Sequence, residues 1–155
     1  VDQVHYIDDS KATNPHAAAA SLAAFGRVVW IAGGLSKGVT YDELVASHAH
    51  RLRAVVLIGT DSSQLRSALA RHASDVPVIE ASQADTGGEG TPTGEAVMAQ
   101  AVAAAAGVAQ GGDTVLMAPA SASMDQFRSY AHRGEAFIEA VRGYVEGQEQ
   151  TTKEP

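Results

Sequence analysis

The alternation of short β-rich runs with longer alanine-rich stretches constrains this sequence more than any other feature. Five runs rich in Val, Ile and Leu are predicted strands: Val4–Ile7, Val28–Ala32, Ala54–Ile58, Val76–Ile79 and Thr114–Met117. Helices are predicted to begin near Pro15, Tyr41, Ser62, Gly94 and Met124. This order predicts an α/β fold of the Rossmann-like kind, with a doubly wound, mostly parallel sheet and helices on both faces.

Length and charge limit what such a fold can do. The 155 residues suit one domain, expected over 1–145, and we expect the polar segment 146–155 to be a disordered tail. A net charge of −7 without a Lys/Arg run argues against nucleic-acid binding. The composition is too polar for a membrane protein. We expect a monomer whose partners are small molecules or protein.

Cysteine is absent from the chain, which excludes disulfides and thiolate chemistry and suits the cytoplasm. The chain opens on Val1 rather than Met, and residues 1–5 have neither the basic start nor the apolar stretch of a secretory signal. We therefore expect a fragment of a longer chain or a processed one.

Polar loops follow three of the predicted strands. In open α/β sheets, ligands bind beyond the carboxyl ends of the strands, so these loops are the candidates for function. They span residues 8–14, 33–38 and 119–127.

The first loop places Lys11 and Thr13 just ahead of a predicted helix. Backbone N–H groups at a helix start favour an anion, so these side chains could hold a carboxylate or a phosphate. Alternatively the loop is a solvated turn, in which Asp9, Ser10 and Asn14 only satisfy backbone groups. Spacing alone leaves both interpretations open.

The second loop contains the glycine pair Gly33 and Gly34, followed by Lys37 and Gly38. A phosphate-binding loop of the Walker type needs Ser or Thr directly after its lysine, so Gly38 excludes it. What remains is a glycine turn that delivers the Lys37 ammonium near a strand end, as a point charge for an anion. A plain exposed lysine is the alternative.

The third loop has the pattern of a helix start, with Ser123 as a cap and with Asp125 and Gln126 in the first turn. Capping alone would explain these residues. If the helix points into the crevice, the Ser123 hydroxyl and the Met124 amide become donors to a carboxylate, and Tyr130 could form a wall of the pocket.

Other chemistries lack their residues. There is no Gly-x-Ser-x-Gly motif for a hydrolase. His48 and His50 face different ways on a helix, and the other histidines are isolated, so metal-ligand spacing is missing. A phospho-receiver domain has the same order of elements, and Asp8, Asp9 and Asp61 imitate its acidic cluster, but the last strand has no lysine after it.

Taken together, three ordered motifs resemble the C-terminal domain of the Mur ligases, most closely the members that add D-glutamate. The motifs are Asp9-Ser10-Lys11-Ala12-Thr13-Asn14, then Gly33-Gly34-x-x-Lys37-Gly38, then Ala122-Ser123-Met124-Asp125-Gln126-Phe127 with His132-Arg133-Gly134. The similarity runs from Val4 to about Tyr144.

The resemblance implies an ATP-dependent ligase of peptidoglycan synthesis, which adds D-glutamate to UDP-N-acetylmuramoyl-L-alanine through an acyl phosphate. It implies that Thr13, Lys37, Ser123, Met124 and Tyr130 bind D-glutamate. Asp9 and Lys11 would face the ribose and phosphates of the nucleotide, since an acceptor suits hydroxyls and a cation suits oxyanions.

The family also implies what this chain lacks. ATP and Mg²⁺ would be bound mainly by a central domain of the full enzyme, so we expect this domain to hold no catalytic residue or metal of its own and to be inactive alone. Two alternatives stay open, namely a noncatalytic α/β binding module and the equivalent domain of a sister Mur ligase. The Ser10-Lys11-Ala12-Thr13-Asn14 run favours the D-glutamate enzyme over its sisters.

Overall fold

The computed structural model describes residues 3–34, 40–59, 62–81, 93–121 and 127–153. Strands and helices alternate along these residues as the sequence predicts, apart from one short 3-10 helix, η1. The order is β1 (His5–Asp8), α1 (Pro15–Ala23), β2 (Val28–Ala32), α2 (Asp42–His48), η1 (Ala49–Arg51), β3 (Leu52–Leu57), α3 (Ser63–His72), β4 (Val78–Glu80), α4 (Gly94–Val108), β5 (Thr114–Met117) and α5 (Tyr130–Lys153).

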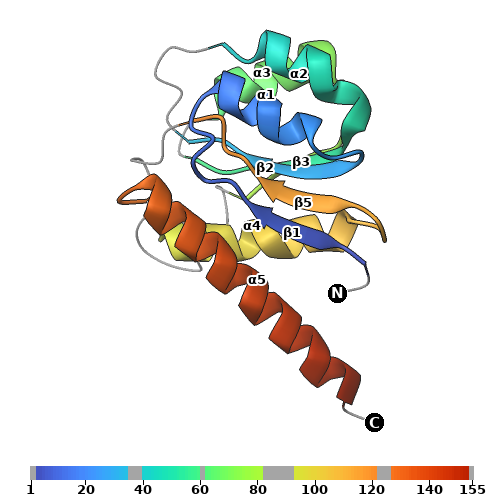
Figure 1. The fold of residues 1–155 in the computed structure, drawn as a ribbon, viewed down its shortest axis with the longest axis vertical. Coiled ribbons are helices and arrows are strands. Elements are labelled where there is room, and N and C mark those ends of the chain that lie inside the picture. Colours follow the sequence, from blue (N-terminus) through green and yellow to red (C-terminus); the bar gives the residue numbers. More distant parts are fainter. Residues whose placement is uncertain (1–2, 35–39, 60–61, 82–92, 122–126, 154–155) are drawn as a thin grey trace.

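The five strands form one sheet in the order β1-β5-β2-β3-β4, and every pairing is parallel. The last strand in sequence, β5, is therefore inserted between β1 and β2. Helices α1, α2 and α3 cover one face of the sheet, and α4 and α5 cover the other (Figure 1). The predicted fold class, an α/β sheet covered on both faces, is confirmed.

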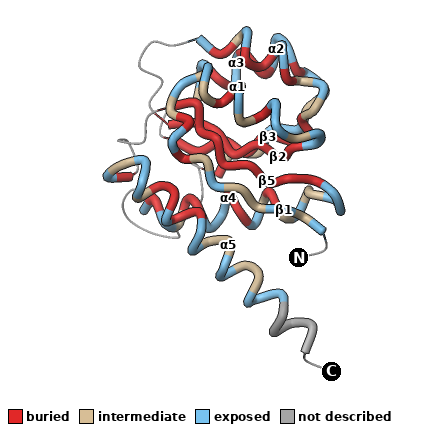
Figure 2. The backbone as a smooth tube through the Cα atoms, in the orientation of Figure 1, coloured by how far each residue is buried: buried red, intermediate tan, exposed pale blue. Residues whose placement is uncertain are grey.

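Two core clusters sit on the two faces of the sheet, and the buried sheet residues are coloured red in Figure 2. Along β2, Val28 and Trp30 point to one cluster, whereas Val29 and Ile31 point to the other. This is the period of two that a strand buried on both faces requires. All five residues of β2 are buried.

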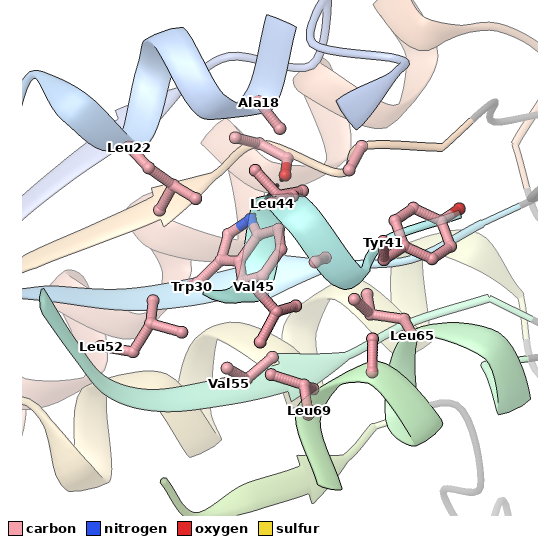
Figure 3. Close-up of a cluster of buried hydrophobic side chains, with 14 of the residues drawn as sticks. Ala18, Leu22, Trp30, Tyr41, Leu44, Val45, Leu52, Val55, Leu65 and Leu69 are labelled. Carbon is pink, nitrogen blue, oxygen red and sulfur yellow. Dashed lines mark hydrogen bonds between the residues drawn. The ribbon is translucent and has the colours of Figure 1, made fainter. Parts of the chain in front are cut away.

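Trp30 lies at the centre of the cluster under α1, α2 and α3, surrounded by Leu22, Val45, Leu52 and Val55 (Figure 3). Its indole Nε1 donates to the Ala118 carbonyl oxygen at 2.6 Å. A buried indole N–H without a partner would be costly, so this bond both satisfies the side chain and ties β2 to the segment after β5.

The ends of β1, β3 and β4 differ from the sequence prediction by one or two residues, and the larger differences lie in α5. Helix α5 begins at Tyr130 rather than near Met124. The hydroxyl of Ser129 accepts from the backbone N–H of His132 at 3.0 Å, so Ser129 supplies the capping oxygen there. The predicted cap, Ser123, lies outside the described residues. Helix α5 also continues through Lys153, so the structure describes 146–153 as helix where the sequence favours a disordered tail.

Gly33 follows β2 with a φ of +122°, and a methyl group added to it would lie 2.0 Å from the carbonyl oxygen of Ile58. We predict that Gly33→Ala destabilises the domain by about 2 to 5 kcal/mol, because both backbone strain and a clash with rigid main chain oppose it. Urea denaturation followed by circular dichroism measures this difference.

The matched control is Gly26→Ala, because a methyl group there meets nothing within 4 Å. We expect its free energy of unfolding to stay within about 1 kcal/mol of the parent value. Equal effects at the two glycines would contradict the close approach of β2's end to Ile58.

Candidate functional site

The candidate site is the sheet edge where β1, β5 and β2 end, because these three neighbouring strands release the polar loops picked out by the sequence. Main-chain hydrogen bonds join the loops directly. The Ala120 N–H donates to the Ala12 carbonyl at 2.8 Å, and the Gly33 N–H donates to the Pro119 carbonyl at 2.9 Å. The stems of all three loops therefore form one continuous surface.

The seven predicted site residues are only partly within the described chain. Asp9, Lys11, Thr13 and Tyr130 are described, whereas Lys37, Ser123 and Met124 lie outside the described residues. The residues flanking the latter are placed, however. Gly34 and Tyr41 are buried on the two sides of the second loop, and Ser121 and Phe127 are buried on the two sides of the third.

Asp9, Lys11 and Tyr130 line one surface cavity of about 350 Å³, together with Asp8, Ser10, Ala131, Gly134, Glu135 and Ile138. Tyr130 is 47% exposed. The sequence interpretation grouped Tyr130 with the D-glutamate residues, but the structure places it beside Asp9 and Lys11, the pair expected to face a nucleotide. Thr13 is not among the residues that line this cavity.

Asp8 borders the same cavity, and its carboxylate lies close to the backbone of Gly134. A methyl group on Gly134 would approach Asp8 Oδ2 to 2.9 Å, so a side chain there would displace the Asp8 carboxylate. Desolvation raises the pKa of Asp8 above its ordinary value, and a hydrogen bond from the Ser10 N–H opposes that rise.

Asn14 has a structural role, as one of the two interpretations of the first loop proposed. Its side-chain oxygen accepts from the Ala17 N–H at 2.9 Å, and Pro15 occupies the first helical position of α1. The neighbouring Thr13 is half-buried. The loop thus carries a cap for α1 and, on the other side of Ala12, the cavity residues Asp9 and Lys11.

Sequence reasoning did not assign a role to Arg133, which is fully buried. Its guanidinium donates to the Ser10 hydroxyl, to the Ser10 carbonyl and to the Ser121 carbonyl, each at 3.0 Å. A signal was present, because Arg133 occupies the apolar stripe of α5 that continues with Ala136 and Phe137. An arginine on a core-facing stripe implies buried acceptors around it.

Tyr41 and Ser121 were also missed. The Tyr41 hydroxyl and the Ser121 hydroxyl are 2.6 Å apart, and both residues are only 2% exposed. Figure 3 shows Tyr41 at the border of the core cluster, with its hydroxyl oxygen directed away from Trp30. Burial raises the pKa of Tyr41 and its bond to Ser121 opposes the rise, so the phenol stays protonated near neutral pH.

His132 fixes the start of α5 against α4. Its Nδ1 accepts from the Arg128 N–H at 3.0 Å, and its Nε2 lies 2.6 Å from Glu95 Oε1. Because Nδ1 is an acceptor, Nε2 carries the hydrogen and donates it to Glu95. The Phe127 ring packs edge-on against the imidazole with centroids 5.4 Å apart. A surface cavity of about 400 Å³ opens beside this pair.

Within the described parts of the chain, no group of three or more His, Asp or Glu side chains could hold a metal ion. No helix among them is long and apolar enough to cross a membrane. The carboxylate of Asp9 and the ammonium of Lys11 instead offer an acceptor for hydroxyls and a donor for oxyanions, which is the chemistry a nucleotide requires.

Fold and site together define an α/β domain whose loop stems meet at the carboxyl edge of a parallel sheet, which is where ligands bind in open α/β folds. Residues 1–121 match the family model described as Mur ligase, glutamate ligase domain. The match covers most of the chain, so the chain belongs to this family.

Proteins named UDP-N-acetylmuramoylalanine--D-glutamate ligase are similar to this chain over nearly its whole length. The Streptomyces avermitilis protein is 60% identical over 143 residues, covering 92% of this chain and 29% of the relative. The Thermobifida fusca protein is 58% identical, with 92% and 29% covered, and the Mycobacterium avium protein is 52% identical, with 93% and 33% covered. The chain thus spans a third or less of each relative's length.

The bond from His132 lowers the pKa of Glu95 below its ordinary value. A depressed carboxyl pKa stabilises the fold above the ordinary pKa, and this contribution is lost as the pH falls through the depressed value. We predict that His132→Phe returns the Glu95 pKa toward the ordinary value, as followed by NMR titration of the side-chain carboxyl carbon.

The control for this titration is His50→Phe, which alters an exposed histidine on η1. We expect it to leave the Glu95 titration unchanged. Identical Glu95 titration curves in the parent and in His132→Phe would show that the bond between α4 and α5 does not form in solution.

Proposed function

We propose that this chain is the amino-acid-binding domain of a ligase that adds D-glutamate to UDP-N-acetylmuramoyl-L-alanine in peptidoglycan synthesis. The observation that carries the proposal is the identity of 60% over 92% of the chain to a protein named as that ligase. The main-chain bonds between the loops after β1, β5 and β2 support it, because they place the described stems of the three loops at one edge of the sheet.

In the proposed reaction, the carboxylate of the nucleotide substrate is activated by ATP as an acyl phosphate. The amine of D-glutamate then attacks the acyl carbon, and phosphate leaves as the amide bond forms. This domain's share of the work is to hold the amine in line with that carbon and to exclude water. ATP and Mg²⁺ would be bound mainly by the rest of the full enzyme, in the cytoplasm.

D-Glutamate is a dianion, so its binding needs several donors at fixed positions. We assign one carboxylate to Lys37 and Thr13, and the other to the Ser123 hydroxyl and the Met124 backbone N–H. Leaving either carboxylate unpaired in a closed site would be costly. The ammonium and hydroxyl donors come from three different loops, which makes the spacing of the loops a determinant of specificity.

Asp9 and Lys11 are proposed to contact the nucleotide, with the carboxylate on ribose hydroxyls and the ammonium on phosphate oxygens. Their place in one cavity with Tyr130 supports this assignment. Tyr130 would then border the nucleotide as well as the amino acid, because it stands at the start of α5, between the first and third loops.

The test is steady-state kinetics of Lys37→Ala in the full-length enzyme, with ADP formation as the readout. We predict that the KM for D-glutamate rises at least about tenfold, since a charge-assisted hydrogen bond contributes about 1.5 to 3 kcal/mol. The KM for ATP should change by less than about twofold, because Lys37 belongs to the amino-acid subsite.

Lys153→Ala provides the matched control, because it removes the same charge at the far end of α5. Both KM values should equal those of the parent enzyme. An unchanged D-glutamate requirement in Lys37→Ala would refute the role given to Lys37. ADP formation by the parent enzyme that does not depend on D-glutamate would refute the proposed function itself.

A further inference from the structure

We propose that a buried chain of hydrogen bonds through Tyr41, Ser121, Arg133 and Ser10 sets the affinity for D-glutamate by locking the three binding loops in one arrangement. We call these four residues the loop clamp. They are positioning residues, because the proposed contacts to substrate come from other side chains. The inference rests on the proposed function and adds to it the residues that determine the spacing of its donors.

The first link of the loop clamp joins the second loop to the third. Tyr41 comes just after the segment that contains Lys37, and Ser121 comes just before the segment that contains Ser123. The two hydroxyls are 2.6 Å apart. The point where the chain leaves one donor segment is therefore bonded to the point where it enters the other.

The second link joins the third loop to the first through Arg133. The Ser121 carbonyl and the Ser10 carbonyl each accept from the guanidinium, so one rigid planar group spans both loops. Ser10 stands between Asp9 and Lys11 in the chain. Arg133 thus connects the proposed nucleotide contacts to the proposed D-glutamate contacts.

The hydrogen-bond directions at Ser10 are fixed. The Ser10 hydroxyl has one hydrogen and donates it to the Tyr130 carbonyl at 2.6 Å. Toward Arg133 it can therefore only accept, as it does at 3.0 Å. Every clamp residue is at most 5% exposed, so water cannot readily replace a lost bond and the broken partner is left unsatisfied.

The consequence for binding follows from the shape of the substrate. Two carboxylates at a fixed separation need donors at a fixed separation, and here the donors lie on different loops. If the loops are already ordered before the substrate binds, the binding of D-glutamate does not have to offset the entropy lost on ordering them. Loosening a loop should therefore weaken the binding of D-glutamate, because substrate binding must then also order the loop.

The test uses the full-length enzyme with Tyr41→Phe, Ser121→Ala and the double variant. Each single variant should raise the KM for D-glutamate about tenfold while the KM for ATP stays within about twofold. The double variant should match the single variants, because both substitutions break the same bond. Arg133→Lys should raise both KM values, since it also loosens Ser10 between the nucleotide contacts.

Two controls separate positioning from general stability. Tyr144→Phe removes a hydroxyl from a half-buried tyrosine further along α5. Asp113→Asn weakens the bond to Arg53 just before β5, at the opposite edge of the sheet. Asp113→Asn should lower the melting temperature without changing the KM for D-glutamate. If it raises that KM as much as Tyr41→Phe does, general loosening explains the effect and the inference is overturned.

Different experimental results would refute the inference and the proposed function. If the parent enzyme requires another amino acid, the proposed function is wrong, but the same variants still test the loop clamp with that amino acid. Additive effects of Tyr41→Phe and Ser121→Ala, or an unchanged KM in both, would overturn the inference while the D-glutamate requirement of the parent enzyme stands.

Discussion

The guanidinium of Arg133 is the buried charge on which the arrangement of the binding edge depends. It lies on the core-facing side of α5, is fully buried, and donates to oxygens on the loops after β1 and β5. Burying an unpaired cation would cost several kcal/mol, so the oxygens that both loops present to Arg133 favour the packing of α5 on the sheet. The packing of α5 on the sheet and the shape of the proposed binding site therefore depend on the same loop positions.

The order of the strands in the sheet also determines where the proposed donors lie. With β5 between β1 and β2, the three loops that carry the proposed donors leave from adjacent strands. Trp30 reinforces the insertion, since its indole N–H is satisfied only by the carbonyl of Ala118 beyond β5. Residues of the core therefore also hold the loops of the site in place. At position 33, glycine allows the end of β2 to approach the main chain of Ile58 closely.

Much of the fold could be predicted from the sequence, because strand and helix periodicities are local. The predicted span Thr114–Met117 and the start of α1 at Pro15 agree with the structure. The strand order could not be predicted, since pairing depends on contacts between distant segments. The start of α5 was misplaced because Ser123 and Ser129 are both suitable caps, and local pattern does not choose between them.

At the site, the residue types predicted which loops carry polar side chains, but not the hydrogen bonds that join these loops. Asp9, Lys11 and Tyr130 line one cavity, and the sequence did not indicate that Tyr130 lies beside the other two, because spacing does not give the direction in which a helix presents its first turn. Tyr41 belongs to none of the three motifs, and the His132-Arg133-Gly134 motif does not indicate what Arg133 does. Their roles appear only when the tertiary structure brings Ser121 and Ser10 within hydrogen-bond distance.

The central claim is that donors on three loops converge on one amino-acid ligand. A crystal structure of the full-length enzyme with D-glutamate bound tests it most directly. We predict that the Lys37 ammonium and the Thr13 hydroxyl lie within hydrogen-bond distance of one carboxylate, and Ser123 within that distance of the other. A structure with Lys37 on the opposite side of the domain from Thr13 and Ser123, or with D-glutamate bound away from this sheet edge, would contradict the claim.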